Sequence, residues 1–341
     1  MTASSPRRLR IGILGAANIA RLFVEGVRPS VKVAVTAVAS RDVERARKFA
    51  SATGIAHVHS TYEALLADPD IDAIYNPLPN SLHAEWSIRA ANAGKHVLCE
   101  KPLAPSASEA HAMFDAATRN DVYLVEAYPY RAQPQTLKLR ELLKENAIGR
   151  PQLIQAAFGF PLSDASNIRL NPVLAGGSLM DAGCYPVSLV RTIAGERPNC
   201  VHAVARWSES GVDRTLFATI EFASGLLAQI SCSFATARHR HAFVVGDVES
   251  IRTTYFNDTS ATFPPVLEVR RGPGWDAKQE VIETAATNGF LAEAEAFRDL
   301  VVHGRDQWEG ASPEESIDIA LTLEALAASA RQGVTVEVAT Y

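Results

Sequence analysis

The chain has 341 residues, of which 47% are hydrophobic and 21% are charged, and its net charge is −5. At about 150 residues per domain, this length predicts two domains. The sequence has no basic stripe with interleaved aromatic residues, so nucleic acid is not expected as a partner. No apolar run reaches the roughly 18 residues of a membrane helix, so no membrane association is expected either.

The cysteines and the start of the chain indicate a protein of a reducing compartment. The cysteines have no CxxC spacing, so neither a disulfide framework nor a zinc or other metal site is predicted; they are Cys99, Cys184, Cys200 and Cys232. Arg7 and Arg8 precede an apolar run, as the arginines of a twin-arginine export signal do. We favour the interpretation that they flank the first strand, and we expect a cytoplasmic protein.

The first 125 residues alternate short apolar runs with helical patterns. Strands are predicted over residues 9–15, 32–40, 71–79, 95–102 and 122–129. Helices are predicted over residues 18–27, 41–54, 61–68, 81–94 and 106–121. This alternation is typical of parallel βαβ units with right-handed crossovers, and it predicts a doubly wound α/β domain.

The pattern changes after about residue 150 to β-rich runs with few helices between them. These runs cover residues 151–160, 200–208, 214–222, 226–234, 241–247, 250–256 and 266–271, and they predict a mostly antiparallel sheet. Helices are predicted over residues 176–195, 289–304 and 312–333. The last of these begins with Ser312 and Pro313 at cap positions, and Glu315 completes the spacing of a capping box.

A degenerate dinucleotide fingerprint follows the first strand. In residues 15–20 the first glycine, Gly15, is kept, and alanine occupies the other two glycine positions. In the fingerprint, a tight turn brings a helix N-terminus to the pyrophosphate of the cofactor. An ordinary strand–turn–helix connection is the alternative interpretation.

The end of the second strand indicates which dinucleotide would bind. An NAD site usually has an acidic residue there, but this chain has Ser40 and Arg41, with Arg45 one helical turn later. A hydroxyl and a guanidinium suit the 2′-phosphate of NADP. The alternative is that these arginines form ion pairs with Asp42 or Glu44.

A lysine stands where the reaction centre of such a fold is expected. Residues 76–83 and 100–102 fall at the carboxyl ends of predicted parallel strands, where open α/β sheets bind ligands. Lys101 would project into the nicotinamide crevice, stabilise negative charge on a substrate oxygen and lower the pKa of a neighbouring phenol. The alternative is a solvated surface charge.

Asp181 and Tyr185 form the second candidate group. Residues four apart on a helix share a face, so both side chains would point the same way. Gly176 and Gly177 precede them and permit a close approach of the backbone. A tyrosine with a cationic neighbour can exchange a proton with an alcohol or carbonyl oxygen. Helix capping for Asp181 and core packing for Tyr185 are the alternatives.

The order and spacing of several motifs resemble one oxidoreductase family along nearly the whole chain. They are residues 12–20, 39–50, 79–83, 100–104, 126–135 and 176–186, and the family is that of glucose–fructose oxidoreductase and inositol dehydrogenase (Gfo/Idh/MocA). The sequence looks most like its NADP-linked dihydrodiol dehydrogenases, D-xylose dehydrogenases and sugar ketoreductases. The resemblance implies a catalytic role for Lys101, Asp181 and Tyr185. Many members have histidine at the position of Tyr185.

The resemblance also implies the domains and the remaining site residues. An NADP-binding Rossmann domain would span residues 1–127, and an α+β domain with a large open sheet would span 128–341, its late helices packing back on the first domain. Cofactor contacts are expected from Gly15, Ala17, Asn18, Ile19, Ser40, Arg41, Arg45, Pro79, Asn80, His83, Glu100 and Lys101. Tyr130 and Arg131 would line the substrate pocket, with interdomain packing as the alternative.

The expected function is that of an NADP-dependent oxidoreductase. It would transfer a hydride between the nicotinamide and a sugar, cyclic polyol or vicinal diol, or the matching ketone or lactone. Two alternatives are a non-catalytic NADP(H)-binding regulator and an enzyme whose tightly bound cofactor cycles between substrates. A homo-oligomer is expected through the second sheet, on the assumption that Phe217, Ile220 and Phe222 leave both of its faces apolar.

Overall fold

The computed structural model describes residues 7–340, which form two compact units. The first contains residues 7–103, 109–133 and 287–311, and the second contains residues 104–108, 134–286 and 312–340. The predicted boundary after residue 127 differs from this division. The turn η2 (Pro129–Ala132) packs against helix α8 (Gly289–His303), so both belong to the first unit. Residues 1–6 and 341 of the predicted domains lie outside the described residues.

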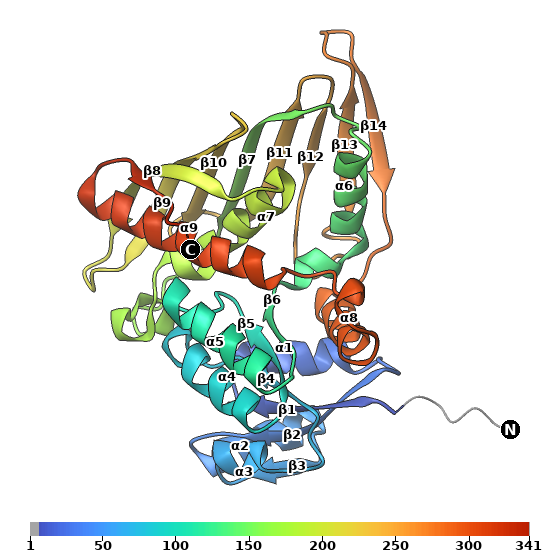
Figure 1. Ribbon diagram of the computed structural model, residues 1–341, viewed down its shortest axis with the longest axis vertical. Coiled ribbons are helices and arrows are strands. Elements are labelled where there is room, and N and C mark those ends of the chain that lie inside the picture. Colours follow the sequence, from blue (N-terminus) through green and yellow to red (C-terminus); the bar gives the residue numbers. More distant parts are fainter. Residues whose placement is uncertain (1–6, 341) are drawn as a thin grey trace, which may run out of the picture. The chain divides into compact units, whose positions relative to one another are not determined.

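The first unit is built on a six-stranded parallel sheet with the strand order β3-β2-β1-β4-β5-β6 (Figure 1). This order confirms the expected Rossmann-type fold. Its strands are β1 (Leu9–Leu14), β2 (Val33–Ala39), β3 (His57–His59), β4 (Ala73–Asn76), β5 (His96–Glu100) and β6 (Leu124–Ala127). Its helices, besides α8, are α1 (Asn18–Val27), α2 (Val43–Thr53), α3 (Tyr62–Leu66), α4 (His83–Asn92) and α5 (Ala107–Arg119).

An aromatic cluster joins α1 and α8 to the sheet of the first unit. Phe23 of α1 stacks on Tyr75 of β4 with ring centroids 4.0 Å apart, and it meets Phe290 of α8 edge-on at 6.3 Å. All three side chains are buried in one hydrophobic core. This burial of aromatic area makes α8 part of the Rossmann unit, although residues 134–286 of the chain between them belong to the second unit.

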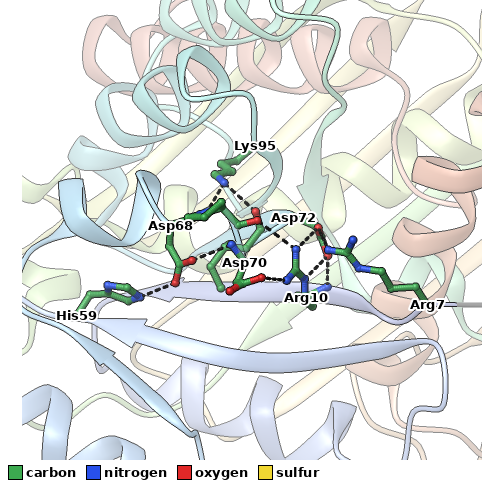
Figure 2. Close-up of polar contacts among 9 residues, drawn as sticks. Arg7, Arg10, His59, Asp68, Asp70, Asp72 and Lys95 are labelled. Carbon is green, nitrogen blue, oxygen red and sulfur yellow. Dashed lines mark hydrogen bonds and ion pairs between the residues drawn. The ribbon is translucent and has the colours of Figure 1, made fainter.

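A network of charged residues fastens the amino-terminal ends of three strands in this sheet (Figure 2). Arg10 of β1 forms an ion pair with Asp72, which directly precedes β4, at 3.0 Å. Lys95, directly before β5, donates to the backbone carbonyl oxygens of Asp68 and Ile71 at 2.7 and 2.8 Å. Burial opposes ionisation of Asp72, but hydrogen bonds from Arg10 outweigh it and lower the pKa of that carboxyl. The network lies at the end of the strands away from the predicted ligand edge.

The second unit is built on a nine-stranded sheet with the order β14-β13-β12-β11-β7-β10-β9-β8-β15. Among the described residues, β7 and β10 pair in parallel and the other neighbours pair antiparallel, which confirms the mostly antiparallel sheet. The strands are β7 (Pro151–Gly159), β8 (Pro198–Trp207), β9 (Asp213–Phe222), β10 (Leu227–Ser233), β11 (His239–Gly246), β12 (Ser250–Thr253), β13 (Val266–Arg271), β14 (Lys278–Glu283) and β15 (Val336–Glu337).

Three helices cover one face of this sheet, as Figure 1 shows. They are α6 (Pro134–Lys144), α7 (Cys184–Ala194) and α9 (Pro313–Gln332), and they pack against β13, β7 and β8 respectively. The predicted capping box starts α9: Ser312 accepts from the backbone of Glu315, and the Glu315 carboxylate accepts from the backbone of Ser312.

The expectation that both faces of this sheet are apolar is wrong. Along β9, Ile220 and Phe222 alternate with Phe217, so the first two are buried on the covered face while Phe217 is 49% exposed on the other. The open face also carries Thr219 and Glu221. It is therefore a mixed surface with apolar patches, not a continuous apolar one.

Candidate active site

The predicted residues of the first unit gather at the carboxyl ends of its parallel strands. Gly15 follows β1, Ser40 follows β2, Pro79 comes three residues after β4, and Lys101 directly follows β5. The strand order reverses between β1 and β4, because β2 lies on the far side of β1 and β5 lies on the far side of β4. Ligands of open α/β sheets bind at such a switch point. The strand ends thus form the edge on which a cofactor site would be built.

The loop after β1 fits a pyrophosphate. Gly15 has φ +89°, a conformation that favours glycine, and its backbone N–H donates to the carbonyl of Ala39 at 2.7 Å. Helix α1 begins at Asn18, and its N-cap residue, Ala17, makes no side-chain cap hydrogen bond. The first N–H groups of α1 are therefore available to an anion, as the fingerprint requires.

The region after β2 leaves two arginines without an ion pair. Asp42 is the N-cap of α2 and accepts from the backbone of Glu44 and Arg45 at 2.9 and 3.2 Å, while Glu44 pairs with Arg47. Within residues 7–340 no ion pair joins Arg41 or Arg45 to an acid, so the alternative of pairing with Asp42 or Glu44 is not observed. Arg45 donates instead to the carbonyl of Ala16 at 3.1 Å, in the loop after β1.

Glu100 fixes the backbone that carries Lys101. Its carboxylate is buried and accepts from the hydroxyl of Tyr75 at 2.6 Å and from the backbone N–H of Lys101 at 3.2 Å. Strand β5 ends at Glu100, so the lysine leaves the sheet immediately after this anchor. The two carboxylate contacts explain why a buried strand ends in charged residues: the acid holds the turn that presents the cation.

His83 joins the loops after β4 and β5. Its Nδ1 lies 2.9 Å from the carbonyl oxygen of Pro102, its Nε2 lies 2.8 Å from that of Leu78, and the ring is buried. Two carbonyl partners suit an imidazolium, but burial, helped by the charge of Lys101, lowers the pKa of His83 to about 4. At neutral pH the ring is neutral and donates to one carbonyl only. The buried ring therefore fills the space between the two loops, next to the Lys101 turn.

Tyr130 and Arg131 of η2 lie inside the first unit. Their exposed fractions are 0% and 2%, so both side chains are almost completely enclosed. This burial favours packing over lining of an open pocket at these two positions. Their place in a substrate pocket stays a prediction.

In the second unit, a tight backbone approach precedes Asp181 and Tyr185. A Cβ on Gly176 would lie 2.4 Å from the carbonyl oxygen of Arg169, and a Cβ on Gly177 would lie 2.3 Å from a carboxylate oxygen of Asp213. The expected role of these two glycines is confirmed. The Asp213 carboxylate accepts from the hydroxyl of Ser178 at 2.5 Å, and burial raises its pKa although this bond opposes the shift.

Asp181 and Tyr185 lie on one continuous helical segment that changes its winding between them. Residues Leu179–Gly183 form a π-helix, η5, where the sequence predicts an α-helix, and α7 follows with Tyr185 in its first turn. Four residues make close to one full turn in an α-helix and in a π-helix alike. Single π-turns inside helices are common at functional sites. Asp181 accepts from Nε of Arg169 at 2.7 Å, so its carboxylate is held in an ion pair.

Tyr185 is enclosed by residues that the sequence analysis did not identify. Its hydroxyl oxygen accepts from Nδ2 of Asn257 at 2.9 Å. The guanidinium of Arg240 lies over its ring, 4.0 Å from the centroid, and Phe158 meets the ring edge-on at 5.4 Å. One signal was present in the sequence: Arg240 stands at an inward position of an alternating strand, among Ala242 and Val244.

Residues 7–340 contain no group of three His, Cys, Asp or Glu side chains that could hold a metal ion, and the four cysteines form no disulfide. One segment, Pro172–Ala194, is long and apolar enough to cross a membrane by length and composition. Two-thirds of its apolar window is buried in the protein, as in the core helix of a globular domain.

The strand order of the first unit and the glycine turn before α1 are typical of dinucleotide-binding proteins. Residues 9–128 match the family described as "Oxidoreductase family, NAD-binding Rossmann fold", and residues 136–257 match the GFO/IDH/MocA C-terminal domain. The chain belongs to the GFO/IDH/MocA family of oxidoreductases.

Curated relatives cover most of the chain. A D-xylose 1-dehydrogenase (NADP(+)) of Haloferax volcanii is 35% identical over 96% of this chain and 99% of its own length. A dTDP-3,4-didehydro-2,6-dideoxy-alpha-D-glucose 3-reductase of Streptomyces violaceoruber is also 35% identical, over 86% of each chain. A trans-1,2-dihydrobenzene-1,2-diol dehydrogenase of Danio rerio is 35% identical over 72% of this chain and 74% of its own. These are the three branches that the sequence resembles.

A solved structure agrees with these relatives. The 3-ketoreductase from Actinomadura kijaniata, in complex with NADP and TDP-benzene, has a TM-score of 0.85 and 30% identity over 95% of this chain and 98% of its own. Two further structures of that ketoreductase carry a lysine-to-alanine and a tyrosine-to-phenylalanine substitution, each with the same two ligands.

Proposed function

We propose that this chain is an NADP-dependent oxidoreductase that interconverts a hydroxyl group and a carbonyl group on a sugar, cyclic polyol or vicinal diol. The observation that carries the proposal is the position of Lys101, which Glu100 anchors directly after β5 at the switch-point edge of a Rossmann sheet. The relatives named for D-xylose, a dTDP-sugar and a dihydrodiol support this substrate class.

The residues present fit NADP. The α1 N-terminus lacks a side-chain cap, which suits the pyrophosphate, and Ser40 and Arg41 follow β2, where the adenosine ribose would lie. Arg41 has no ion pair that a 2′-phosphate would have to displace. The remaining cofactor contacts expected from the sequence, Pro79 and Asn80 among them, belong to this proposal.

In the proposed mechanism, three side chains of this chain handle the proton and the developing charge. A bound NADP⁺ would supply the hydride acceptor. Tyr185 takes the hydroxyl proton of the substrate during oxidation and returns it during reduction. Lys101 stabilises negative charge that develops on a substrate oxygen. Asp181, held by Arg169, orients the substrate.

A conservative tyrosine substitution tests this mechanism. In a panel of aldoses, polyols and diols assayed with NADP⁺, Tyr185→Phe should lower kcat about 10²–10⁴-fold, because it removes the proton-exchanging group and keeps the ring. The Kd for NADPH should hardly change. Lys101→Ala should be at least as damaging. Tyr123→Phe, a half-buried tyrosine of the first unit, is the matched control and should retain activity.

Three outcomes would speak against the proposal or for one of the alternatives. Normal turnover by Tyr185→Phe across the pH range would show that the phenol only packs, and the mechanism would be wrong. NADP(H) that remains with the protein through purification and is reduced and reoxidised by two different substrates would favour the tightly bound, cycling cofactor. Binding of NADPH with no turnover of any substrate in the panel would favour the regulatory protein.

We also propose that a second copy of the chain binds the open face of the nine-stranded sheet. Cross-strand neighbours share that face: Leu153 pairs with Leu227, and Phe217 pairs with Val204, and each of the four is at least 43% exposed. Measurement of the mass in dilute solution is the test, and a monomer would contradict it. We further propose a location in the cytoplasm, with which the absence of a disulfide among the four cysteines of the described residues agrees.

A further inference from the structure

A buried guanidinium lies against the proposed proton-exchanging tyrosine. Arg240 of β11 is 4% exposed, although a charged side chain is costly to bury. Three aromatic rings surround its guanidinium carbon, which lies 4.0 Å from the ring centroid of Tyr185, 4.6 Å from that of Tyr255 and 4.9 Å from that of Phe158. The ring of Tyr185 is the closest of the three, so the charge acts most directly on that ring.

An amide links the guanidinium to the tyrosine hydroxyl. Nη1 of Arg240 donates to Oδ1 of Asn257 at 3.1 Å, and Nδ2 of Asn257 donates to the hydroxyl oxygen of Tyr185 at 2.9 Å. Because a guanidinium can only donate, the carbonyl end of the amide must face Arg240, and its NH₂ group must face the phenol. The hydroxyl oxygen of Tyr185 therefore receives a hydrogen bond, which favours its deprotonated form.

The other elements around the ring do not oppose this charge. Strand β7 contributes Phe158, and on β11 the two histidines, His239 and His241, alternate with Arg240 and so point to the opposite face. The helical segment of Tyr185 contributes Asp181, whose carboxylate pairs with Arg169 at 2.7 Å. The acid one turn away is thus compensated by its own cation.

We propose that Arg240 and Asn257 are positioning residues that hold Tyr185 in place and stabilise its phenolate form. This inference rests on the proposed function, because it assumes that Tyr185 exchanges the substrate proton. In the oxidation direction, the phenolate oxygen takes the hydroxyl proton while the hydride leaves the carbon for NADP⁺, and the C–O bond becomes a carbonyl. From the sequence alone this tuning was expected of Lys101, whereas Arg240 belongs to the same unit as the tyrosine.

The pH dependence of oxidation tests the proposal. An opposite charge within about 4–6 Å lowers an acid's pKa by roughly one to three units. Arg240→Gln should therefore move the rise of kcat with pH upward by roughly one to three pH units, with little change in KM. Arg240→Lys keeps the charge and should largely restore the profile. Arg305→Gln removes an exposed guanidinium that lies 5.7 Å from the ring centroid of Tyr123, and it should leave the profile unchanged.

Asn257→Asp provides a second, nearly isosteric test should loss of a buried arginine prevent folding. A carboxylate cannot donate to the phenol and repels the phenolate, so this variant should also move the rise of kcat to higher pH. A fall in kcat with an unmoved profile in both Arg240→Gln and Asn257→Asp would overturn the proposal and leave these residues with a packing role only.

A spectroscopic titration separates this inference from the proposed function. The phenolate absorbance of the protein minus that of Tyr185→Phe reports the ionisation of Tyr185 without any substrate. We expect this difference titration to shift to higher pH in Arg240→Gln and in Asn257→Asp. If Tyr185→Phe is inactive and the titration does not shift, the inference alone is wrong. If Tyr185→Phe turns over normally, the proposed function of Tyr185 fails, and the inference fails with it.

Discussion

Gly177→Ala should destabilise the second unit well beyond the cost of an ordinary glycine substitution. Gly177 has φ +119°, where a side chain strains the backbone by about 1–3 kcal/mol. Its new Cβ would also lie 2.3 Å from Oδ1 of Asp213, so the carboxylate must move. That movement weakens the bonds that Asp213 accepts from Ser178 and Leu179 at 2.5 and 2.7 Å, for about 1.5–3 kcal/mol more.

The expected total is about 2.5–6 kcal/mol, a large part of the roughly 5–15 kcal/mol that stabilises a typical domain. For a unit of this size, thermal unfolding should occur roughly 5–24 °C lower. Because η5 begins two residues after Gly177, the same displacement should misplace Asp181 and Tyr185 and lower kcat. Circular dichroism during heating measures the first effect, and steady-state turnover at a temperature where the variant is folded measures the second.

Gly195→Ala is the matched control in the same unit. Gly195 also has a positive φ, +69°, but a Cβ there would meet nothing within 4 Å, so only about 1 kcal/mol should be lost. In an Asp213→Ala background, Gly177→Ala should cost much less, because the overlapping carboxylate is absent. If Gly177→Ala is no more destabilising than Gly195→Ala, the contact with Asp213 does not constrain this turn, and the reasoning is refuted.

Two further predictions concern the first unit. Arg41→Ala should raise the KM for NADP roughly 10- to 150-fold and hardly change the KM for NAD, because about 1.5–3 kcal/mol of phosphate binding is lost. Steady-state kinetics with both cofactors measure this effect, and Arg47→Ala is the control. Equal effects on the two KM values would contradict the prediction. Asp72→Asn should destabilise the unit by about 1–3 kcal/mol at pH 7, as denaturant titration would show, with kcat unchanged. Folding lowers the pKa of Asp72, so the stabilisation from its carboxylate is present above the ordinary carboxyl pKa near 4 and is lost as the pH falls further. The difference in unfolding free energy between wild type and variant should therefore shrink in acid. A difference that stays constant with pH would contradict the role given to the ionised carboxylate.

The fold followed from the sequence wherever burial imposes a period on the residues. The strand–helix alternation of the first 125 residues and the capped helix α9 are examples. The short strands β3, β14 and β15 were not predicted. Four of the six residues of β14 are charged or amide, and β15 has only two residues, so neither carries an apolar alternation that a sequence pattern would show.

The site was predictable only where a motif marked it. Lys101 and Tyr185 stand in recognisable stretches, but the residues that hold them come from distant parts of the chain. Asn257 is 72 residues from Tyr185, and Tyr75 is 25 residues from Glu100. Such contacts depend on which strands become neighbours, and local spacing contains no information on that. The π-turn at Leu179–Gly183 was missed because its residues fit an α-helical pattern equally well.

The strand order of the nine-stranded sheet has a consequence for the time course of folding. β7 is the first of these strands in the chain, yet it lies between β10 and β11, which come after β8 and β9. At a synthesis rate of about 5–20 residues per second, β7 leaves the ribosome roughly 5–20 s before the end of β11 does. Until β10 emerges, both of its edges are unpaired, and until β11 emerges one edge still lacks its partner. The newly made chain is therefore most exposed to strand-to-strand aggregation between the emergence of β7 and the emergence of β11. The non-local pairing also makes this sheet the slow step of folding.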